Sequence, residues 1–431
     1  MSSSSIKSFK SARSFFSESS KSKETTIFNS VKSQLSESRK LKANKKIYKL
    51  FVPYIKRASV NIIDRINYFL IMKKYIMSIK ENNNCVRLYN IDDNKITYRI
   101  GNRIILDKQI GRISGNGIVY LSHFKSNIKF GNKYDKLNKF AVKITTNDKY
   151  NLHELKILEL LTKKVIEFKC PHFPICYGSL KCDNSIITSN TSDDYLIVKD
   201  KQGDVKLFPE LINKNNKILI QINELASGDL KYYLEFIQNK NMLNTITQIL
   251  LCIMFFSNYT NLIHNDCHSG NFLFHKIKPG GYFHYNIFGI DYYLENLGYL
   301  WVIWDFGLTE FYNLKPINTD FLRIIISILY DKKYYSNTEF EIIFYLIDKI
   351  VNKYNQIVDT NKIKDINIEI LQYLLINTSS FITEKPSNII NKKPYIITDI
   401  KPPAKINKTM NPFSYAKKLY LIANDIYKTK F

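Results

Sequence analysis

Three polar side chains in the second half of the chain have the chemistry that phosphoryl transfer requires. Asp266 and Asn271 belong to residues 264–271 (HNDCHSGN), and Asp305 belongs to residues 303–307 (IWDFG). A carboxylate such as Asp266 can position and deprotonate an acceptor hydroxyl, while Asn271 and Asp305 offer oxygen ligands for Mg2+ on the phosphates. Each motif alone is too short to identify a site. The prediction of a phosphoryl-transfer site therefore rests on the order of the motifs along the chain.

Upstream residues supply the cation that such a reaction needs. Lys143 stands near the end of the β-like run 140–144 (FAVKI), where it can neutralise nucleotide phosphates. A buried lysine requires an anionic partner, and the helical segment that follows offers Glu154, with Glu159 as the alternative. Before the lysine, the segment 111–120 (GRISGNGIVY) predicts a glycine-bearing turn whose backbone N–H groups can hold phosphates.

The spacing of apolar residues predicts the elements that must position these groups. Residues 46–80 have helical spacing interrupted near Pro53, which predicts two helices. One helix is also expected over 152–165, and after Gly228 the pattern is mainly helical. Strands are predicted at 96–100, 103–106, 117–121, 140–144, around 186–187, at 195–198 and at 218–222. This order favours an α+β fold, in which a strand-rich part with one helix precedes a mainly helical part.

In this order, the motifs resemble the eukaryotic protein kinase superfamily, over roughly residues 105–330. The resemblance implies a bilobal, protein-kinase-like α+β fold. Its N-lobe would contain a small antiparallel β-sheet with one key helix, and its C-lobe would be larger and mainly helical. The catalytic residues that it implies are Asp266, Lys143, Glu154 and His268, and the implied metal ligands are Asn271 and Asp305.

The resemblance also implies an ATP site. The segment 224–230 (ELASGDL) is similar to the connection between the two kinase lobes, whose backbone hydrogen-bonds adenine. The glycine spacing departs from that of kinase glycine-rich loops. The residues expected around the nucleotide are Gly111, Gly115, Gly117, Val119, Ala141, Lys143, Glu224 and Ala226.

His268 occupies a position where protein kinases usually carry lysine. With histidine at this position, the chain resembles haspin-like kinases and also aminoglycoside and choline phosphotransferases. The histidine would either sense the γ-phosphate or fill space. His264, in contrast, is expected to brace the loop through a backbone hydrogen bond, because the base role is assigned to Asp266.

The spacing between motifs also departs from ordinary protein kinases. A long interval precedes Asp305, and Gly280-Gly281 followed by alternating residues predicts an inserted β-hairpin around Gly289. The segment after Gly307 is short, because Asp320 already resembles the aspartate that opens the next helix. Divergent serine/threonine kinases of giant viruses resemble the chain in these features.

Composition and charge set the predicted domain divisions. The chain has 431 residues with 63 Lys and Arg against 38 Asp and Glu, and its composition excludes a wholly disordered chain or a collagen-like fibre. A Ser- and Lys-rich tail is predicted at 1–45, a helical extension at 46–95, an N-lobe at 96–225, and a C-lobe at 226–431 with the hairpin at about 276–300. The tail is either a polyanion-binding arm or a solvated extension.

Cysteine spacing and hydropathy indicate the compartment. The six cysteines form no CxxC pair, which predicts reduced thiols, and those around His172 fit no common zinc spacing. The longest apolar run, 249–256, is shorter than the roughly 20 residues that span a bilayer. We therefore expect a soluble or peripheral protein without a transmembrane segment. Its expected location is the cytoplasm, or the host cytoplasm or the virion if the chain is viral.

The favoured hypothesis is an ATP- and Mg2+-dependent kinase that phosphorylates Ser or Thr hydroxyls of a protein substrate. Two alternatives stay open. One is a pseudokinase scaffold, favoured by the irregular glycine turn and the short segment after Gly307. The other is a phosphotransferase for small molecules, favoured by His268. The acceptor distinguishes these alternatives.

Overall fold

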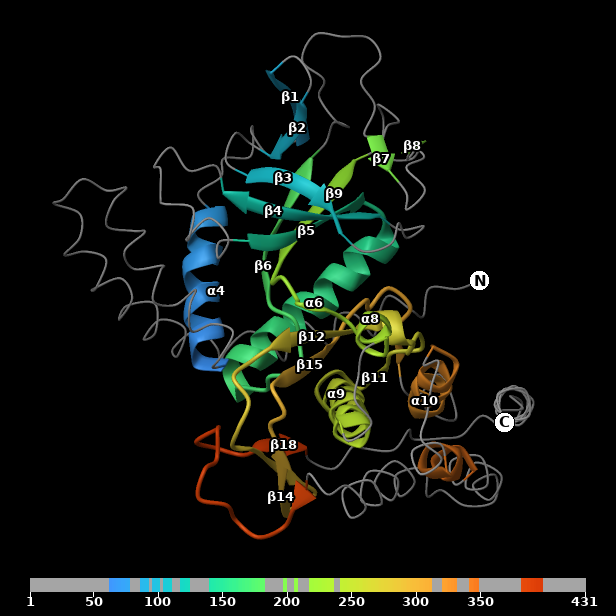
Figure 1. The fold of residues 1–431 in the computed structure, drawn as a ribbon. Coiled ribbons are helices and arrows are strands. Elements are labelled where there is room, and N and C mark those ends of the chain that lie inside the picture. The colour runs from blue at the N-terminus through green and yellow to red at the C-terminus, as the bar shows by residue number, and fades with distance from the viewer. Residues whose placement is uncertain are drawn as a thin grey trace, which may run out of the picture. The chain divides into compact units, whose positions relative to one another are not determined.

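The structure, a computed structural model, describes residues 62–77, 86–92, 95–100, 104–110, 117–124, 139–182, 197–199, 205–207, 217–235, 241–311, 320–331, 341–348 and 381–397. All of these residues belong to one unit, Ile55–Phe431. Their helices and mostly antiparallel sheets form an α+β fold (Figure 1). The α+β class predicted from the sequence is therefore confirmed.

Seven of the strands before residue 224 form one sheet in the order β1-β2-β3-β4-β5-β9-β6. Every neighbouring pair in this sheet is antiparallel. The strands are β1 (Val86–Asp92), β2 (Lys95–Ile100), β3 (Ile104–Gln109), β4 (Ile118–Phe124), β5 (Lys139–Thr146), β6 (Cys176–Cys182) and β9 (Ile218–Asn223). A separate pair consists of β7 (Ile197–Lys199) and β8 (Val205–Leu207).

The register of the central strands places five side chains on one face of this sheet. Val119 of β4 and Gln221 of β9 both lie opposite Lys143 of β5. Two residues away, Asn223 of β9 lies opposite Ala141. Directly paired residues share a face, and so do alternate residues along a strand. The intervening positions bury the apolar side chains Ile118, Tyr120, Val142, Ile144, Ile220 and Ile222.

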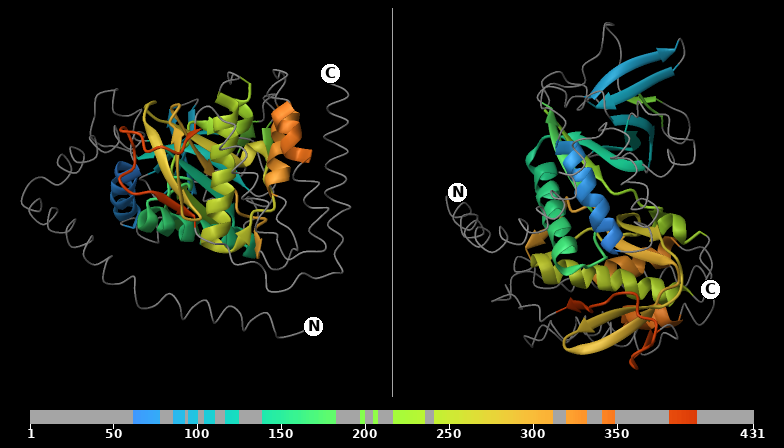
Figure 2. Two further views of the ribbon diagram at one scale, coloured as in Figure 1. Left: turned by 90° about the horizontal axis from the view of Figure 1, so that it is seen from below. Right: turned by 90° about the vertical axis from the view of Figure 1, so that its left-hand side faces the viewer.

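Helix α6 (Lys149–Phe168) packs against β6 and β9 and also contacts α9 in the second half of the chain (Figure 2). The helix starts after Asp148, whose side chain accepts hydrogen bonds from the backbone N–H groups of Tyr150 and Asn151. It ends at Lys169 in the left-handed conformation. Its buried face includes Leu155, Leu158, Leu161 and Val165, together with Glu154.

Helix α4 (Ile62–Met77) packs against β6. Gly178 of β6 permits the close approach, because a Cβ atom there would lie 3.1 Å from Cγ2 of Ile76. This helix matches the second of the two predicted between residues 46 and 80, whereas the first lies outside the described residues. The predicted extension is too long, however, since β1 lies inside 46–95 and belongs to the sheet. The alternation in VRLYNID, followed by Asp and Asn, is a hairpin signal that the helical interpretation missed.

The second half contains α8 (Leu230–Tyr233), α9 (Met242–Thr260), α10 (Asp320–Asp331) and a helix at 341–348. In the described part of the chain, α9 is the one helix long and apolar enough to cross a membrane, but 83% of its apolar window is buried inside the fold. It contacts α6, β15 and α10. This burial indicates that α9 is a core helix.

Strands are more frequent after Gly228 than the mainly helical prediction allowed. β10 (Gly228–Asp229), β12 (Phe272–Lys276) and β15 (Tyr299–Ile303) form one sheet, and β11 (Leu262–Ile263) pairs with β16 (Glu310–Phe311). A 3-10 turn over Ser269–Asn271 leads into β12. β10, β11 and β16 have two residues each, and such short ladders leave no periodic pattern in the sequence.

The hairpin predicted around Gly289 is present. β13 (Tyr282–Ile287) pairs with β14 (Ile290–Glu295), and the two turn residues Phe288 and Gly289 both have positive φ, of 53° and 85°. Strands β17 (Phe381–Ile382) and β18 (Tyr395–Ile397) extend it to the order β17-β14-β13-β18. The sequence did not predict this extension by residues 381–397.

The cysteines depart in part from the prediction of reduced thiols. Cys170, Cys176, Cys252 and Cys267 are free and buried. Cys182 is disulfide-bonded, which contradicts that prediction for this position. His172 is not a metal ligand here, because its ring nitrogens contact the Trp301 carbonyl at 2.8 Å and the Tyr285 hydroxyl at 2.9 Å.

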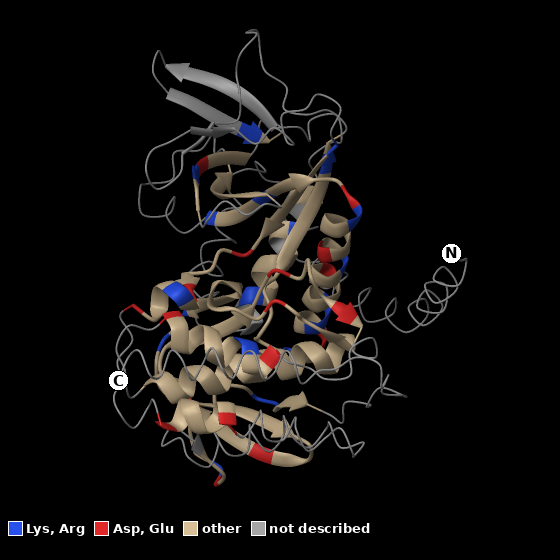
Figure 3. Ribbon diagram, turned by 90° about the vertical axis from the view of Figure 1, so that its right-hand side faces the viewer, with Lys and Arg blue, Asp and Glu red and all other residues tan. Residues whose placement is uncertain are grey.

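Figure 3 shows described Lys and Arg residues interspersed with Asp and Glu on the side that faces the viewer. The strongly basic balance of the whole chain is therefore not concentrated in one patch of the described residues on this side. The predicted polyanion-binding tail at 1–45 lies outside the described residues.

Candidate functional site

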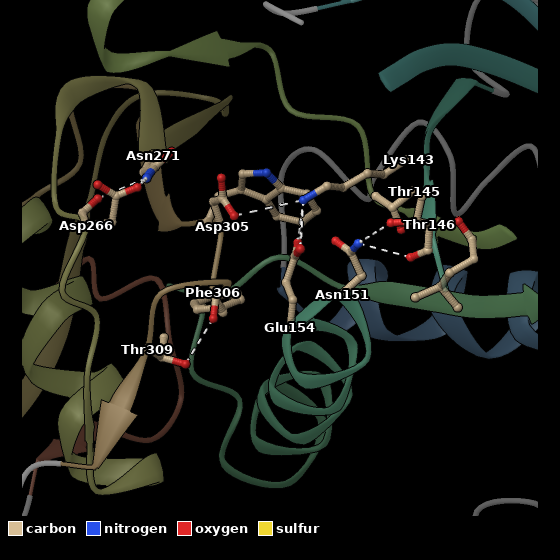
Figure 4. Close-up of polar contacts among 12 residues, drawn as sticks. Lys143, Thr145, Thr146, Asn151, Glu154, Asp266, Asn271, Asp305, Phe306 and Thr309 are labelled. Carbon is tan, nitrogen blue, oxygen red and sulfur yellow. Dashed lines mark hydrogen bonds and ion pairs between the residues drawn. The ribbon is translucent and has the colours of Figure 1, made fainter. Parts of the chain in front are cut away.

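Lys143 and Glu154 form a buried ion pair between the sheet and α6 (Figure 4). The Lys143 Nζ atom lies 2.7 Å from Oε1 and 2.8 Å from Oε2 of Glu154. The two side chains are only 5% and 3% exposed. Glu159, the alternative partner in the sequence, is exposed. The structure therefore selects Glu154 as the partner of the lysine.

The surroundings keep this lysine charged. Burial alone would lower the pKa of the Lys143 ammonium, but Glu154 and then Asp305 outweigh it and raise the pKa above its ordinary value. The Nζ atom also lies 5.9 Å from the centre of the Trp304 ring, within range of a cation–π interaction. A fixed positive charge on this face of the sheet can bind an anion such as a phosphate.

Asp305 follows β15, two residues after its last residue, and its carboxylate lies near the lysine. Its Oδ1 atom lies 3.9 Å from Nζ of Lys143, and its side chain is 30% exposed (Figure 4). Its φ angle is 63°, a left-handed conformation that non-glycine residues seldom adopt. Such outliers concentrate at functional sites, where surrounding structure holds the strained residue in place.

Asn271 adjoins the same ladder. Phe272 lies opposite Ile303, and the Trp304 N–H donates to the Asn271 carbonyl at 2.8 Å. The Asn271 Nδ2 group donates to the backbone carbonyl of Asp266 at 2.9 Å and to its Oδ2 atom at 3.0 Å (Figure 4). The predicted base and one predicted metal ligand are therefore in direct contact.

The loop that carries Asp266 is held from two sides. Oδ2 of Asp320 accepts from the His264 N–H at 2.8 Å, and Oδ1 accepts from the Asn265 N–H at 2.9 Å. His264 contacts the Trp304 carbonyl through Nε2 at 2.9 Å, as expected for a bracing residue. Burial is the main cause that lowers the pKa of His264. Because the Trp304 carbonyl can only accept a hydrogen bond, Nε2–H is the donor. This bonding joins the 264–271 loop to the segment around Asp305.

Phe306 adds an apolar brace behind the same loop. Its ring stacks on Phe256 of α9 with centroids 5.4 Å apart and meets the His264 ring edge-on at 5.6 Å. Phe306 is 1% exposed, whereas the neighbouring Asp305 is partly exposed. The buried phenyl ring anchors the segment, so that the carboxylate beside it has a defined position.

His268 lies beside the predicted base. Its Nδ1 atom accepts a hydrogen bond from the Gly270 N–H at 3.0 Å, and its Nε2 atom lies 3.7 Å from Oδ2 of Asp266. The side chain is about half exposed, at 51%. These positions place an imidazole near the carboxylate without a short hydrogen bond between them.

The residues predicted around the nucleotide are only partly described. Gly111 and Gly115 lie outside the described residues. At Gly117 a Cβ atom would lie 2.5 Å from Cγ2 of Thr145 and 2.6 Å from the Ile144 carbonyl oxygen, so no larger residue fits. Val119 and Ala141 are partly exposed and lie on the Lys143 face of the sheet.

The predicted adenine-binding backbone follows directly after β9. The Glu224 N–H is already bonded to the Ile175 carbonyl at 2.9 Å, so the Glu224 carbonyl is the group that remains for a ligand. The backbone N–H of Ala226 has no hydrogen-bond partner among the described residues, and this residue is partly exposed. One acceptor and one donor thus lie two residues apart on the connecting segment.

Sequence analysis missed Arg65 of α4, which holds this connecting segment. Its Nε and Nη2 atoms donate to Oε1 and Oε2 of Glu224 at 2.7 and 2.8 Å, and its Nη groups also donate to the Pro171 and Phe173 carbonyls. Burial alone would raise the pKa of Glu224, but Arg65 and then His275 lower it. The detectable signal was an arginine in register with apolar positions of a helix, at the spacing of Phe69, Met72 and Ile76.

The oxygen atoms present here suit Mg2+. Among the described residues, no group of three or more His, Cys, Asp or Glu side chains could hold a metal. Asn271 and Asp305 instead offer one amide oxygen and one carboxylate, and the Asn271 Oδ1 atom accepts no hydrogen bond within the described part. Mg2+ is commonly bound through one or two such ligands together with substrate phosphates and water.

Comparison with models of protein families matches none of them, and comparison with curated proteins finds no significant match. The functional argument therefore depends on the site itself. Around adjoining loops the chain arranges a fixed cation, two oxygen ligands for a divalent metal, and a carboxylate in contact with one of those ligands. This set can bind a nucleotide phosphate and activate a hydroxyl group.

Proposed function

We propose that this protein is an ATP- and Mg2+-dependent kinase that transfers the γ-phosphate to Ser or Thr hydroxyls of a protein substrate. The observation that carries the proposal is the buried Lys143–Glu154 pair, whose ammonium lies 3.9 Å from Asp305. A lysine in this setting fits the binding of nucleotide phosphates next to a metal ligand. The resemblance to protein kinases and the order of the motifs support the same assignment.

The five residues divide the tasks of the proposed reaction between them. Asp266 orients the acceptor hydroxyl and accepts its proton, while Asn271 keeps the Asp266 carboxylate in position through Nδ2. The Asn271 Oδ1 atom and the Asp305 carboxylate would hold Mg2+, which neutralises charge on the phosphates when bound. Lys143 binds the phosphates, and Glu154 fixes the direction of its side chain.

We infer a bilobal, kinase-like arrangement from the positions of the elements. The seven-stranded sheet with α6 would be the N-lobe, and α9, α10 and the strands after Gly228 would be the C-lobe. The segment from Glu224 to Ser227 would connect them and bind adenine through its backbone. Ala226 is partly exposed, and its N–H has no partner among the described residues, which is consistent with that role.

A small-molecule phosphotransferase is the second candidate. Helix α10 begins at Asp320, which leaves a short segment after Asp305 for contacts with a peptide substrate. His268, near Asp266, is also shared with aminoglycoside and choline phosphotransferases. The pseudokinase alternative has less support, because all five residues are present: Lys143 contacts Glu154 and Asp305, and Asn271 contacts Asp266.

Transfer of radiolabelled γ-phosphate from ATP with Mg2+ tests the proposal. Basic, acidic and neutral proteins serve as acceptors, and autophosphorylation is scored in parallel. We expect Lys143→Met, Asp266→Asn and Asp305→Ala to lower transfer at least about 100-fold, since loss of a general base alone costs that much. Glu154→Ala should lower it as well, whereas its matched control Glu159→Ala, on the exposed side of α6, should not.

The other outcomes separate the alternatives. ATP that binds with Mg2+ but is transferred to no acceptor would favour the scaffold. Label on choline or an aminoglycoside, with none on protein, would favour the small-molecule enzyme. Transfer that survives Asp305→Ala would contradict the assigned metal site.

A further inference from the structure

Within the described part of the chain, two buried amides on β9 lack hydrogen-bond partners. Gln221 is 0% exposed and Asn223 is 1% exposed, and both amide atoms of each side chain are unsatisfied within the described residues. Buried polar groups are nearly always hydrogen-bonded, and an unpaired one costs free energy. Two adjacent exceptions on one strand therefore indicate groups that are satisfied by a ligand or by water.

Both amides belong to the face of the sheet that carries the candidate site. Gln221 lies opposite Lys143, and Asn223 lies opposite Ala141. Along a strand, residues two apart are separated by about 7 Å, so the amides are neighbours on that face. Asn223 is the last residue of β9 and immediately precedes the connecting segment that begins at Glu224.

The position of Asn223 defines what it can contact. Under the proposed function, adenine lies against the connecting segment, with its Watson–Crick edge toward the backbone of Glu224 and Ala226. A side chain at the end of β9, on the same face as Ala141, then lies beside an adjacent edge of the base. Gln221 lies two residues before Asn223 on β9, opposite Lys143, which binds the phosphates under the same proposal.

We propose that Asn223 recognises the N6/N7 edge of the adenine ring of ATP. An asparagine amide presents one acceptor and one donor side by side, and adenine presents the N6 amino donor beside the N7 acceptor, a bidentate match. Guanine presents two acceptors, O6 and N7, on the corresponding edge, so the Asn223 carbonyl oxygen would remain unpaired against it. The assignment rests on the proposed nucleotide site.

Binding of ATP and 7-deaza-ATP provides a direct test. The analogue lacks only the N7 acceptor, and its affinity in the presence of Mg2+ can be measured by calorimetry on the full chain. We expect the wild-type protein to bind 7-deaza-ATP about tenfold more weakly than ATP, as loss of one hydrogen bond and burial of its donor predict. This comparison requires no variant to fold.

Two variants assign the preference to one residue. Asn223→Leu keeps the branched shape of the side chain but cannot hydrogen-bond, so it should bind ATP and 7-deaza-ATP equally. Gln221→Met removes the other buried amide from the same face and is the matched control, because it should retain the tenfold preference. Circular dichroism and thermal unfolding show whether both variants are folded.

The opposite results have separate meanings. Equal affinity of the wild-type protein for the two nucleotides would overturn the assignment of Asn223 while leaving the kinase proposal intact. A preference that persists in folded Asn223→Leu would overturn it as well. If folded wild-type protein bound neither nucleotide, the proposed function itself would be wrong, and the inference with it.

Discussion

Asn271 shows at the residue scale why an amide is required where a carboxylate would also bind metal. Its Nδ2 group donates two hydrogen bonds to Asp266, which an aspartate at this position could not do. An aspartate would also place a second negative charge beside the predicted base, and the two carboxylates would repel each other. The amide therefore holds the base in place and still leaves Oδ1 for a cation.

Two buried histidines predict how stability depends on pH. Burial is the main cause that lowers the pKa of His172 and of His275 to about 4. In the unfolded chain these residues titrate near 6.5, so between about 6.5 and 4 only the unfolded state binds the protons. We expect the free energy of unfolding to fall as the pH falls through this window, by up to about 3 kcal/mol for each histidine.

Denaturant unfolding at a series of pH values between 4.5 and 7.5 measures this effect. His275→Gln removes one of the two titrating groups and should make the decline less steep. His268→Gln, which replaces a side chain that is about half exposed, provides the comparison with a histidine that is not buried. A stability that stays constant across the window would contradict the neutral, buried state of both rings.

The sequence was sufficient to predict site residues whose partners lie nearby in the chain or are required by the proposed reaction. Lys143 and Glu154 are 11 residues apart, and a buried lysine before a helix calls for an acid on that helix. Arg65 and Glu224 are 159 residues apart, and no motif connects them. Asn223 was missed for the same reason, since its importance depends on which strands lie beside β9.

At the scale of elements, the turn of the β13–β14 hairpin contains a residue that such turns rarely have. Both turn positions have positive φ, which favours Asn or Gly at the first and Gly at the second. Phe288 occupies the first position at φ 53°, and left-handed backbone costs a non-glycine residue about 1–2 kcal/mol. The turn is therefore formed at a cost that the flanking strands must offset.

Substitutions at these two neighbouring positions should have opposite effects. Phe288→Asn should raise the free energy of unfolding by up to about 1 kcal/mol, because asparagine tolerates this conformation better. Gly289→Ala should lower it by about 1 kcal/mol, and only through the backbone, since a Cβ atom there meets no atom of the described residues within 4 Å. Thermal unfolding of both variants checks the signs; a shift in the same direction would contradict the turn.

The hairpin itself was predictable, but its surroundings were not. Gly280 and Gly281 precede two alternating segments and Gly289 lies between them, which is sufficient to predict two paired strands. The added strands β17 and β18 have two and three residues. Such short segments have no period of their own, and their pairing depends on how the intervening chain returns.

At the scale of the whole molecule, the Arg65–Glu224 pair links α4 to the segment that connects the two halves. Arg65 donates to both oxygens of Glu224 and to two backbone carbonyls, and its side chain is 3% exposed. Its removal would leave a carboxylate buried without its cation. We expect Arg65→Met to lower the free energy of unfolding by about 3–5 kcal/mol.

A double variant and a control make this prediction specific. Arg65→Met combined with Glu224→Gln should be more stable than Arg65→Met alone, because the unpaired charge is gone. Lys73→Met, at an exposed position of the same helix, should change stability by less than about 0.5 kcal/mol. Chemical denaturation of the wild-type protein, Arg65→Met, Glu224→Gln and the double variant gives the coupling; purely additive effects would contradict the ion pair.

The pairing of β13 with β18 has a consequence for synthesis of the chain on the ribosome. Tyr285 pairs with Tyr395 in parallel, and Tyr293 of β14 pairs with Ile382. Until residues 381–397 have left the ribosome, both outer edges of the β13–β14 hairpin lack these strands. Unpaired edges are sites of intermolecular association. A nascent chain that stalls before residue 381 should therefore be more prone to aggregate than one that has passed residue 397.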